Sequence, residues 1–294
     1  MTVRQALQDA IEKLTAAHVP SASTTAEVLL LHVLGKDRAF LHAHPETELT
    51  APQAGAFKEL LEKRAGGTPT QYLTGTQEFW GLELHVEPGV FIPRPETEHV
   101  VEVTLKLIRE RLQKPTARVM DIGTGTGCIA LALAKELPEA EIIASDASPQ
   151  AIALAKRNAE SLGLAGRVQF VKGELLDSFF SHHGTVFGFD NRSFDVIVSN
   201  LPYVDPAEAD QLPREVREHE PAEALYSEEE GLGTTKTLID QGRFALVRNG
   251  WMVIELGYNM AERVKALFGD AWANLEVTND LRCIPRVLCA QKQR

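Results

Sequence analysis

Apolar strands alternate with amphipathic helices through the last two thirds of the chain. The best-marked strand, 118–122, is followed at once by Gly123-Thr124-Gly125-Thr126-Gly127 and then by a helix. Strands separated by helices form parallel sheets with helices packed on both faces. The sequence therefore predicts an α/β, doubly wound domain over 96–294, closed by an antiparallel pair of strands near 273–278 and 286–290. Within it we expect a helix over about 97–113, a helix capped by Ser148 with Pro149 at its first position, and a loop over 177–192.

The glycine turn predicts a ligand held against backbone N–H groups at a helix N-terminus. Its spacing is Gly-x-Gly-x-Gly, whereas dinucleotide enzymes have Gly-x-Gly-x-x-Gly. This difference favours a nucleoside with an amino-acid tail. Asp121 would bind the ammonium group of that tail, and Asp146, at the next strand tip, would accept both ribose hydroxyls. Glu174 or the backbone of Leu175, at the third tip, would meet the adenine.

This ordered set of strand tips favours S-adenosylmethionine as the cofactor over another nucleotide or a purely structural turn. Phe91 and Asn200 would flank the same ligand from neighbouring segments. The predicted cofactor-binding residues are Asp121, Gly123, Thr124, Gly125, Thr126, Gly127, Asp146, Ala147, Glu174, Leu175, Asn200 and Phe91.

The fourth strand, 194–198, runs into Ser199-Asn200-Leu201-Pro202-Tyr203. By itself this stretch fits a strand-ending turn, because Asn and Pro often punctuate strands. Next to a bound methyl donor it offers a side-chain amide, a backbone carbonyl and an aromatic face, which suit a planar amide or amino group. We therefore predict Asn200, Leu201, Pro202 and Tyr203 as the catalytic and substrate-binding residues.

Two further segments precede this domain. Residues 1–71 are helical in pattern and show no chemistry, so a recognition module is the functional interpretation. Thr24 or Thr25 can cap its second helix, and Thr50-x-x-Gln53 resembles a capping box. Residues 72–95 read as a strand pair with a turn at Gly81, followed by a proline-rich linker. The two prolines around Arg94 force an extended backbone, which serves either as a rigid connector or as a wall of the site with Phe91 or Arg94 facing a ligand.

Composition limits the partners. The formal net charge of the 294-residue chain is -11, and affinity for a phosphate backbone comes largely from Lys and Arg, so direct nucleic-acid binding is disfavoured. No apolar run approaches the ~20 residues of a membrane span, and no signal peptide is recognisable. The three cysteines have no paired spacing, so neither a zinc site nor a disulfide framework is suggested. We expect a cytoplasmic protein without a metal, and nothing demands more than a monomer.

Several motifs together closely resemble the HemK/PrmC family. They are Leu73-Thr74-Gly75 through Glu78-Phe79, Ile92-Pro93-Arg94-Pro95-Glu96-Thr97-Glu98, Asp121 through Gly127, Glu220-Pro221 with Ala224-Leu225 and Gly231-Leu232, and Asp280 with Arg286. The resemblance covers essentially the whole chain. It implies an S-adenosylmethionine-dependent methyltransferase that modifies the Gly-Gly-Gln glutamine of class I peptide-chain release factors, with residues 1–71 engaging the release factor.

One residue departs from the family pattern. The family usually has Asn-Pro-Pro-Tyr, and this chain has Leu201 at the first proline. Asn-Leu-Pro-Tyr is typical of ribosomal RNA adenine dimethyltransferases, so a methyltransferase acting on an adenine amino group of rRNA or DNA is the alternative function. Those enzymes carry their helical part after the catalytic domain and lack the Pro-Arg-Pro segment. A cofactor-binding protein without catalysis is the third interpretation.

The residues predict a mechanism based on geometry and electrostatics, because no side chain can deprotonate a glutamine amide. The side-chain oxygen of Asn200 and the carbonyl of Leu201 would accept the two amide N–H bonds and turn the nitrogen toward the methyl group. Tyr203 would pack against the amide plane, and Pro202 would fix the turn.

Overall fold

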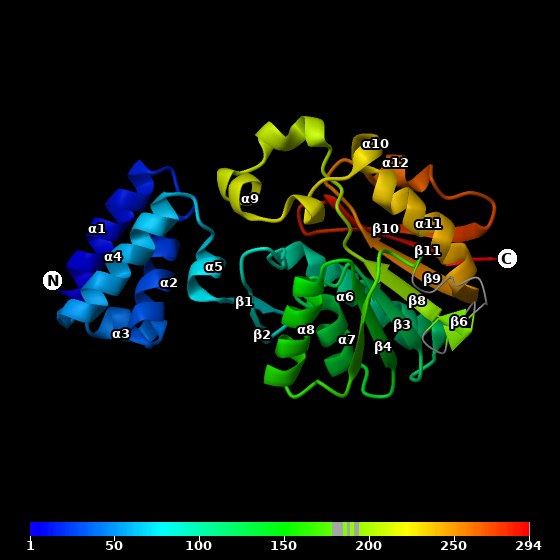
Figure 1. The fold of residues 1–294 in the computed structure, drawn as a ribbon, viewed down its shortest axis with the longest axis horizontal. Helices are drawn as coiled ribbons and strands as arrows, with labels where there is room; N and C mark the ends of the chain where they lie inside the picture. Colours follow the sequence, from blue (N-terminus) through cyan, green and yellow to red (C-terminus); the bar gives the residue numbers. More distant parts are fainter. Residues whose placement is uncertain (178–184, 187–188, 191–193, 294) are drawn as a thin grey trace. The chain divides into compact units, whose positions relative to one another are not determined.

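A computed structural model describes residues 1–177, 185–186, 189–190 and 194–293 of the chain (Figure 1). Contacts divide it into two compact units, Met1–Thr76 with Leu212–Glu220 and Gln77–Gln211 with Pro221–Arg294. No described helix combines the length and the apolar character needed to cross a membrane.

The first unit is helical. Its helices are α1 Val3–Ala16, α2 Ala22–Leu34, α3 Arg38–Ala43, α4 Ala51–Ala65, α5 Thr70–Thr74 and α9 Arg214–His219. The predicted capping box is confirmed, since Thr50 accepts from the Gln53 backbone while the Gln53 side chain accepts from the Thr50 backbone. Gly35 ends α2 in the left-handed conformation, at φ +60°. The predicted caps Thr24 and Thr25 were placed too late, because both lie inside α2.

Helix α9 is tied to this unit by a buried cation. Arg64 of α4 is 4% exposed and forms an ion pair with Glu215 of α9. The same guanidinium donates to the Thr68 carbonyl, 3.3 Å away. A buried arginine is costly unless it is paired, so Glu215 is a structural partner of α4 although it lies far along the sequence.

The second unit begins with the predicted hairpin, β1 Thr76–Phe79 and β2 Leu82–His85, whose turn uses Gly81 at φ +64°. Its sheet has seven strands in the order β10-β11-β9-β8-β3-β4-β5. They are β3 Arg118–Ile122, β4 Glu141–Asp146, β5 Val168–Lys172, β8 Phe194–Ser199, β9 Leu246–Glu255, β10 Trp272–Asn279 and β11 Pro285–Lys292. Neighbours from β9 to β5 pair in parallel, whereas β11 pairs antiparallel with β9 and β10. The predicted doubly wound sheet with its antiparallel end is confirmed.

Alternate residues of the central strands face opposite layers, as the period of a strand requires. Val119 packs in a core with α6 Glu98–Lys106 and α7 Cys128–Glu136. Met120, on the opposite face, packs in the second core with α11 Gly233–Ala245. In Figure 1 the helices of this unit accordingly cover both faces of the sheet. The remaining longer helices are α8 Pro149–Ser161 and α12 Ala261–Lys265.

Some elements were not predicted. The helix expected over 97–113 is divided into a 3-10 turn, Pro95–Thr97, then α6 and a π-helical segment, Leu107–Leu112. The acidic, proline-punctuated stretch after Tyr203, for which no element was predicted, contains short helical turns: Pro206–Gln211, Ala222–Ala224 and α10 Glu228–Gly231. The loop expected over 177–192 lies largely outside the described residues, which include the short strands β6 Thr185–Val186 and β7 Phe189–Asp190.

Candidate active site

Four parallel strands deliver the predicted site residues to one edge of the sheet. Ile122 of β3 is in register with Ser145 of β4 on one side and with Ser199 of β8 on the other. The chain therefore leaves β3, β4 and β8 at the same level. Asp146 ends β4, and Asn200 follows β8. Open parallel sheets bind their ligands at this carboxyl edge.

The glycine loop is built so that its backbone is accessible. Gly123, Gly125 and Gly127 all have positive φ, at +72°, +56° and +86°. A side chain would be strained at each of these positions. Gly125 has no heavy atom within 4 Å of the place a Cβ would take, so its outer side is open. Thr124, Thr126 and Gly127 are buried, whereas Gly123 is exposed and Gly125 half-buried, so the backbone that a ligand can reach is that of Gly123 and Gly125.

Asp121 lies under this loop and is fully buried. The hydroxyl of Thr124 donates to its Oδ2 over 2.6 Å. Within the described part of the chain, Oδ1 is buried without a hydrogen-bond partner. Burial raises the pKa of this carboxyl to about 7. An unpartnered buried acceptor beside the loop is compatible with the predicted ammonium contact, which stays a prediction.

Asp146 is joined directly to the loop. Its Oδ2 accepts from the Gly125 backbone N–H and its Oδ1 from the Ser148 N–H, each over 2.9 Å. Each carboxylate oxygen can accept a second bond, so the predicted contact with two ribose hydroxyls remains available. Burial raises the pKa of this group. Ser148 also caps α8 as predicted, accepting from the Ala151 N–H over 3.2 Å.

The other predicted cofactor residues flank this edge. Ala147 and Glu174 are exposed, and Leu175 is half-buried against the second core. Leu175 has a φ of +45°, a conformation that L residues rarely adopt. Such strain tends to be kept where a functional geometry requires it. It occurs here at the residue whose backbone was predicted to meet the adenine.

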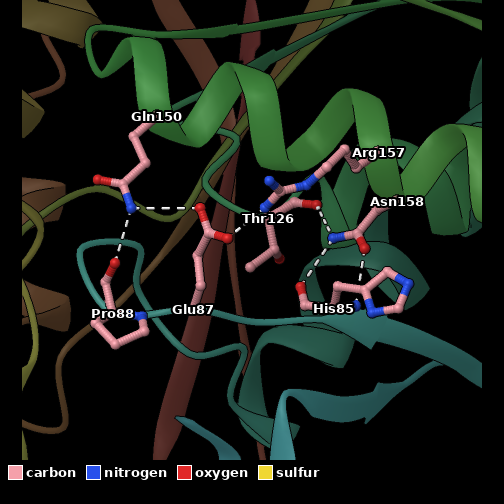
Figure 2. Close-up of polar contacts among 7 residues, drawn as sticks. All are labelled: His85, Glu87, Pro88, Thr126, Gln150, Arg157 and Asn158. Atoms are coloured by element: carbon pink, nitrogen blue, oxygen red, sulfur yellow. Dashed lines mark hydrogen bonds and ion pairs between the residues drawn. The ribbon is translucent and has the colours of Figure 1, made fainter.

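A single buried amide supports the loop from behind, as Figure 2 shows. Asn158 of α8 donates through Nδ2 to the Thr126 carbonyl at 2.9 Å and to the His85 carbonyl at 3.0 Å. Its Oδ1 accepts from the His85 N–H at 2.8 Å. Through these hydrogen bonds Asn158 connects α8 both to the glycine loop and to the end of β2. Sequence reasoning missed this residue.

The segment after β2 is held against the same helix. Gln150 donates to the Glu87 carboxylate at 3.3 Å and to the Pro88 carbonyl at 2.8 Å, and Arg157 forms an ion pair with Glu87. Figure 2 shows these contacts along one side of α8. They fix the start of the segment that carries the predicted site residues Phe91 and Arg94.

The stretch after β8 lies beside the glycine loop. Ser199 donates through Oγ to the Ile122 carbonyl at 2.6 Å. A Cβ on Gly123 would lie 3.5 Å from Cδ2 of Leu201 and 3.8 Å from the carbonyl oxygen of Asn200. The side chain of Leu201 is only 5% exposed and packs in the second core. The structure therefore brings the two predicted halves of the site together.

Tyr203 is held by two glycines. A Cβ on Gly257 would meet the Tyr203 ring at 3.1 Å, and one on Gly231 would lie 2.3 Å from the Tyr203 carbonyl oxygen. No side chain fits at either place without a shift. Burial raises the pKa of the Tyr203 hydroxyl, so it stays protonated at neutral pH. The Gly231-Leu232 motif of the sequence thus has a packing reason.

Two polar residues behind Asn200 were not predicted as site residues. The Asn200 Nδ2 donates to Oγ1 of Thr97 over 3.2 Å. The Thr97 hydroxyl donates in turn to the carboxylate of Glu255, at the end of β9. Glu255 ends an apolar strand at the same sheet edge as Asp146, and this position was the signal in the sequence that could have revealed it.

Charged groups border this cluster. The guanidinium of Arg94 lies over the Phe91 ring, 4.7 Å from its centroid. Arg286 donates to Asp280 over 2.8 Å and pairs with Glu96 at 3.8 Å. The backbone N–H of Ile284 and then Arg286 lower the pKa of Asp280. The pair of Asp280 and Arg286 therefore contacts Glu96, the residue that follows the Pro-Arg-Pro segment, and holds it in place.

Comparison with known proteins decides the family. The PrmC N-terminal domain matches residues 5–75, and a methyltransferase domain matches residues 113–248. The release factor glutamine methyltransferase of Koribacter versatilis is 41% identical over 99% of both chains. The protein of the same name from Salmonella typhimurium is 39% identical over 97% of both. The chain belongs to the release factor glutamine methyltransferase family.

Solved structures agree on the fold. The hMettl16 catalytic domain, in complex with the MAT2A 3'UTR hairpin 6, superposes with a TM-score of 0.54 at 19% identity, over 82% of this chain and 81% of that one. This likeness shows the methyltransferase fold alone. Family membership and this fold confirm the predicted α/β methyltransferase domain with a helical N-terminal part, and S-adenosylmethionine is the cofactor of such a protein.

Proposed function

We propose that this protein methylates the side-chain amide nitrogen of the glutamine in the Gly-Gly-Gln motif of class I release factors. Bound S-adenosylmethionine supplies the electrophilic methyl group. The observation that carries the proposal is the contact between the two halves of the site, where Asn200 and Leu201 lie against Gly123 of the cofactor loop. An amide held by Asn200 is thereby next to the place where the cofactor binds.

The residues of this chain act on the amide by position. The Asn200 oxygen and the Leu201 carbonyl accept its two N–H groups, and the Tyr203 ring packs on its plane. Positive charge that develops on the nitrogen is stabilised by these two acceptors, and after the transfer the nitrogen loses one proton to water to give the neutral N-methyl amide. Leucine supplies the same backbone carbonyl as the usual proline, and its buried side chain fixes the turn through packing. Pro202 restricts the next residue.

The proposal also assigns the cofactor contacts. The glycine loop from Gly123 to Gly127 approaches the ligand with its backbone, Asp121 and Asp146 bind its ammonium and ribose groups, and Leu175 meets the base. The open side of Gly125 and the unpartnered Oδ1 of Asp121 support this assignment. Phe91 and Arg94 form a wall toward the substrate, in contact with each other.

Residues 1–71 are proposed to engage the release factor, 72–95 to link the two parts, and 96–294 to carry the methyl transfer. We further propose that the enzyme works in the cytoplasm as a monomer and does not bind nucleic acid directly. The net charge of -11 supports the last point.

The adenine methyltransferase alternative rests on the Asn-Leu-Pro-Tyr sequence alone. The family relationship does not favour it, because near full-length relatives at 39–41% identity are named for release factor glutamine. The silent binder is disfavoured because Asn200 lies beside the loop and Tyr203, three residues further on, is held in place by Gly231 and Gly257.

One experiment separates the three functions. The protein is incubated with a purified class I release factor and S-adenosylmethionine, and the Gly-Gly-Gln peptide is analysed by mass spectrometry. We expect one CH2 unit of added mass on the glutamine. Radiolabel on rRNA or DNA with none on the release factor would refute the proposal in favour of the adenine enzyme. Cofactor binding without any methylated product would favour the silent binder.

A matched variant tests the role of Asn200. Its charge-assisted hydrogen bond contributes about 1.5–3 kcal/mol to the transition state, so Asn200→Ala should lower kcat by roughly 10- to 150-fold. Cofactor binding, measured by calorimetry, shows whether the loop is intact in the variant. Full kcat with intact cofactor binding would remove Asn200 from the mechanism.

A further inference from the structure

Three segments far apart in the sequence form a polar chain behind the proposed substrate amide. Asn200 follows β8, Thr97 precedes α6 and Glu255 ends β9. Thr97 is 1% exposed and Glu255 is 6% exposed, so both are shielded from water. The hydrogen bonds run from Asn200 to Thr97 and from Thr97 to Glu255.

The direction of these bonds matters because an asparagine amide has two unlike ends. Its oxygen accepts hydrogen bonds and its NH2 group donates them, and the two orientations have nearly the same shape. Only the oxygen can receive the N–H of a substrate amide. Something must therefore hold the NH2 end of Asn200 away from the substrate.

Thr97 and Glu255 can do this. An ionised carboxylate only accepts hydrogen bonds, so the single hydroxyl proton of Thr97 must point to Glu255. The Thr97 oxygen then has only acceptor capacity left for Asn200. The NH2 end of Asn200 satisfies it, and the oxygen end is turned away from Thr97.

We propose that Thr97 and Glu255 are positioning residues that fix the orientation of the Asn200 amide, so that its oxygen and not its NH2 group faces the substrate. This inference rests on the proposed function for the identity of the substrate amide. The geometry of the three residues stands without it.

Protonation of Glu255 would remove the constraint. A neutral carboxyl can donate to Thr97, whose proton is then free to bond the Asn200 oxygen, and the reversed amide presents a donor to the substrate. Burial raises the pKa of Glu255 to about 7. The charged groups facing it are Glu96, Arg94 and Arg286, with the Tyr203 hydroxyl and the Cys128 thiol of α7 also near. Its second oxygen, Oε2, is buried with no partner among the residues that the structure describes.

The first test measures kcat, with the cofactor and the release factor at saturation, for wild type, Thr97→Val and Thr97→Ser. Loss of one hydrogen bond predicts a fall of about tenfold for Thr97→Val, with cofactor affinity within about twofold of wild type. Thr97→Ser keeps the hydroxyl and should restore most of kcat. The matched control is Thr104→Val, which removes a buried hydroxyl that donates to the Val100 carbonyl of the same helix. That control should leave kcat unchanged.

The second test uses the pH profile. Wild-type kcat should rise with pH through about 7 as Glu255 ionises, whereas Glu255→Gln should show no such step, because glutamine does not titrate. A purely structural role of Glu255 would lower kcat equally at all pH values. The same step in wild type and Glu255→Gln would overturn the role of Glu255.

A third readout does not depend on activity. The side-chain NH2 signals of Asn200 are assigned by NMR through their loss in Asn200→Ala, and their exchange with water is measured. We expect faster exchange in Thr97→Val than in wild type and in Thr104→Val. If Thr97→Val does not fold, the same NH2 signals are followed through a pH titration. They should shift near pH 7 in wild type and should not shift in Glu255→Gln.

The outcomes are separable. A wild-type protein that does not methylate the release factor rejects the proposed function, and the NMR result then decides the positioning by itself. Faster NH2 exchange in Thr97→Val supports it. Unchanged exchange together with unchanged kcat in Thr97→Val overturns it.

Discussion

Replacing Asn158 with Asp tests how strongly the glycine loop depends on one buried amide. The change keeps the shape of the side chain and its acceptor for the His85 N–H. It removes both donated bonds, to the carbonyls of Thr126 and His85. A carboxylate at this place would face two carbonyl oxygens in a site that is fully buried.

The magnitude depends on pH and can be worked out. When the new carboxyl is neutral in both states, below about pH 3, it can still donate one bond, so about 1 kcal/mol is lost. Above this pH the unfolded chain releases the proton, with a pKa of about 3.9, while burial keeps the folded group neutral. The folded state then binds the extra proton, and stability falls by about 1.4 kcal/mol per pH unit. Three units give about 4 kcal/mol, and the total loss at pH 7 is about 5 kcal/mol.

Urea unfolding followed by tryptophan fluorescence suits this measurement. All three tryptophans, Trp80, Trp251 and Trp272, lie in the second unit, which also contains Asn158. The matched control is Arg157→Gln, which removes the neighbouring exposed ion pair with Glu87 and should cost less than about 1 kcal/mol. Calorimetry should also show weaker cofactor binding by Asn158→Asp. A loss below about 1 kcal/mol at pH 7, or a loss that does not grow with pH, would refute the reasoning.

Three further changes test other parts of the site. Gly231→Ala places a Cβ 2.3 Å from the Tyr203 carbonyl oxygen, at a φ of +84°. In steady-state kinetics kcat should fall at least about tenfold, while calorimetry should show unchanged cofactor affinity. A variant with the kcat of wild type would contradict the packing role of Gly231. Leu201→Pro keeps the backbone carbonyl but loses a buried leucine side chain. Its kcat should stay within a few fold of wild type, while urea unfolding should show about 1–3 kcal/mol less stability. A large loss of kcat in a folded variant would contradict the role of the carbonyl as hydrogen-bond acceptor. The raised pKa of Glu255 means that the folded state keeps the proton of this carboxyl between the usual pKa of 4.5 and about 7. The free energy of unfolding should therefore fall by about 3 kcal/mol as pH rises across this range. Denaturation curves of Glu255→Gln at several pH values should lack this pH-dependent fall.

Local patterns were sufficient for most of the fold. The capping box at Thr50, the capping of α8 by Ser148 and the turn at Gly81 each depend on a few neighbouring residues, and all were found from the sequence. The parallel sheet followed from the order of strands and helices. The short helices after Tyr203 were missed, because they have too few residues for a periodic pattern to appear.

The site was predictable to the extent that it sits at strand ends. Asp146 and Asn200 were placed at one edge by the rule for parallel sheets, and the structure brings their segments to the glycine loop. Asn158 and the pair Thr97 and Glu255 were missed, since each acts through a hydrogen bond to a residue distant in sequence. Such partners depend on the packing of whole elements, which no local pattern contains.

The division of the chain has a practical consequence for anyone who wants to work with its halves. The first unit takes Leu212–Glu220 from the middle of the sequence, so the polypeptide passes between the units at three points. Cutting after residue 76 would separate Arg64 of α4 from Glu215, its ion-pair partner in α9. The first unit is therefore not a separable N-terminal segment, and exchanging it between relatives requires moving the nine residues Leu212–Glu220 as well.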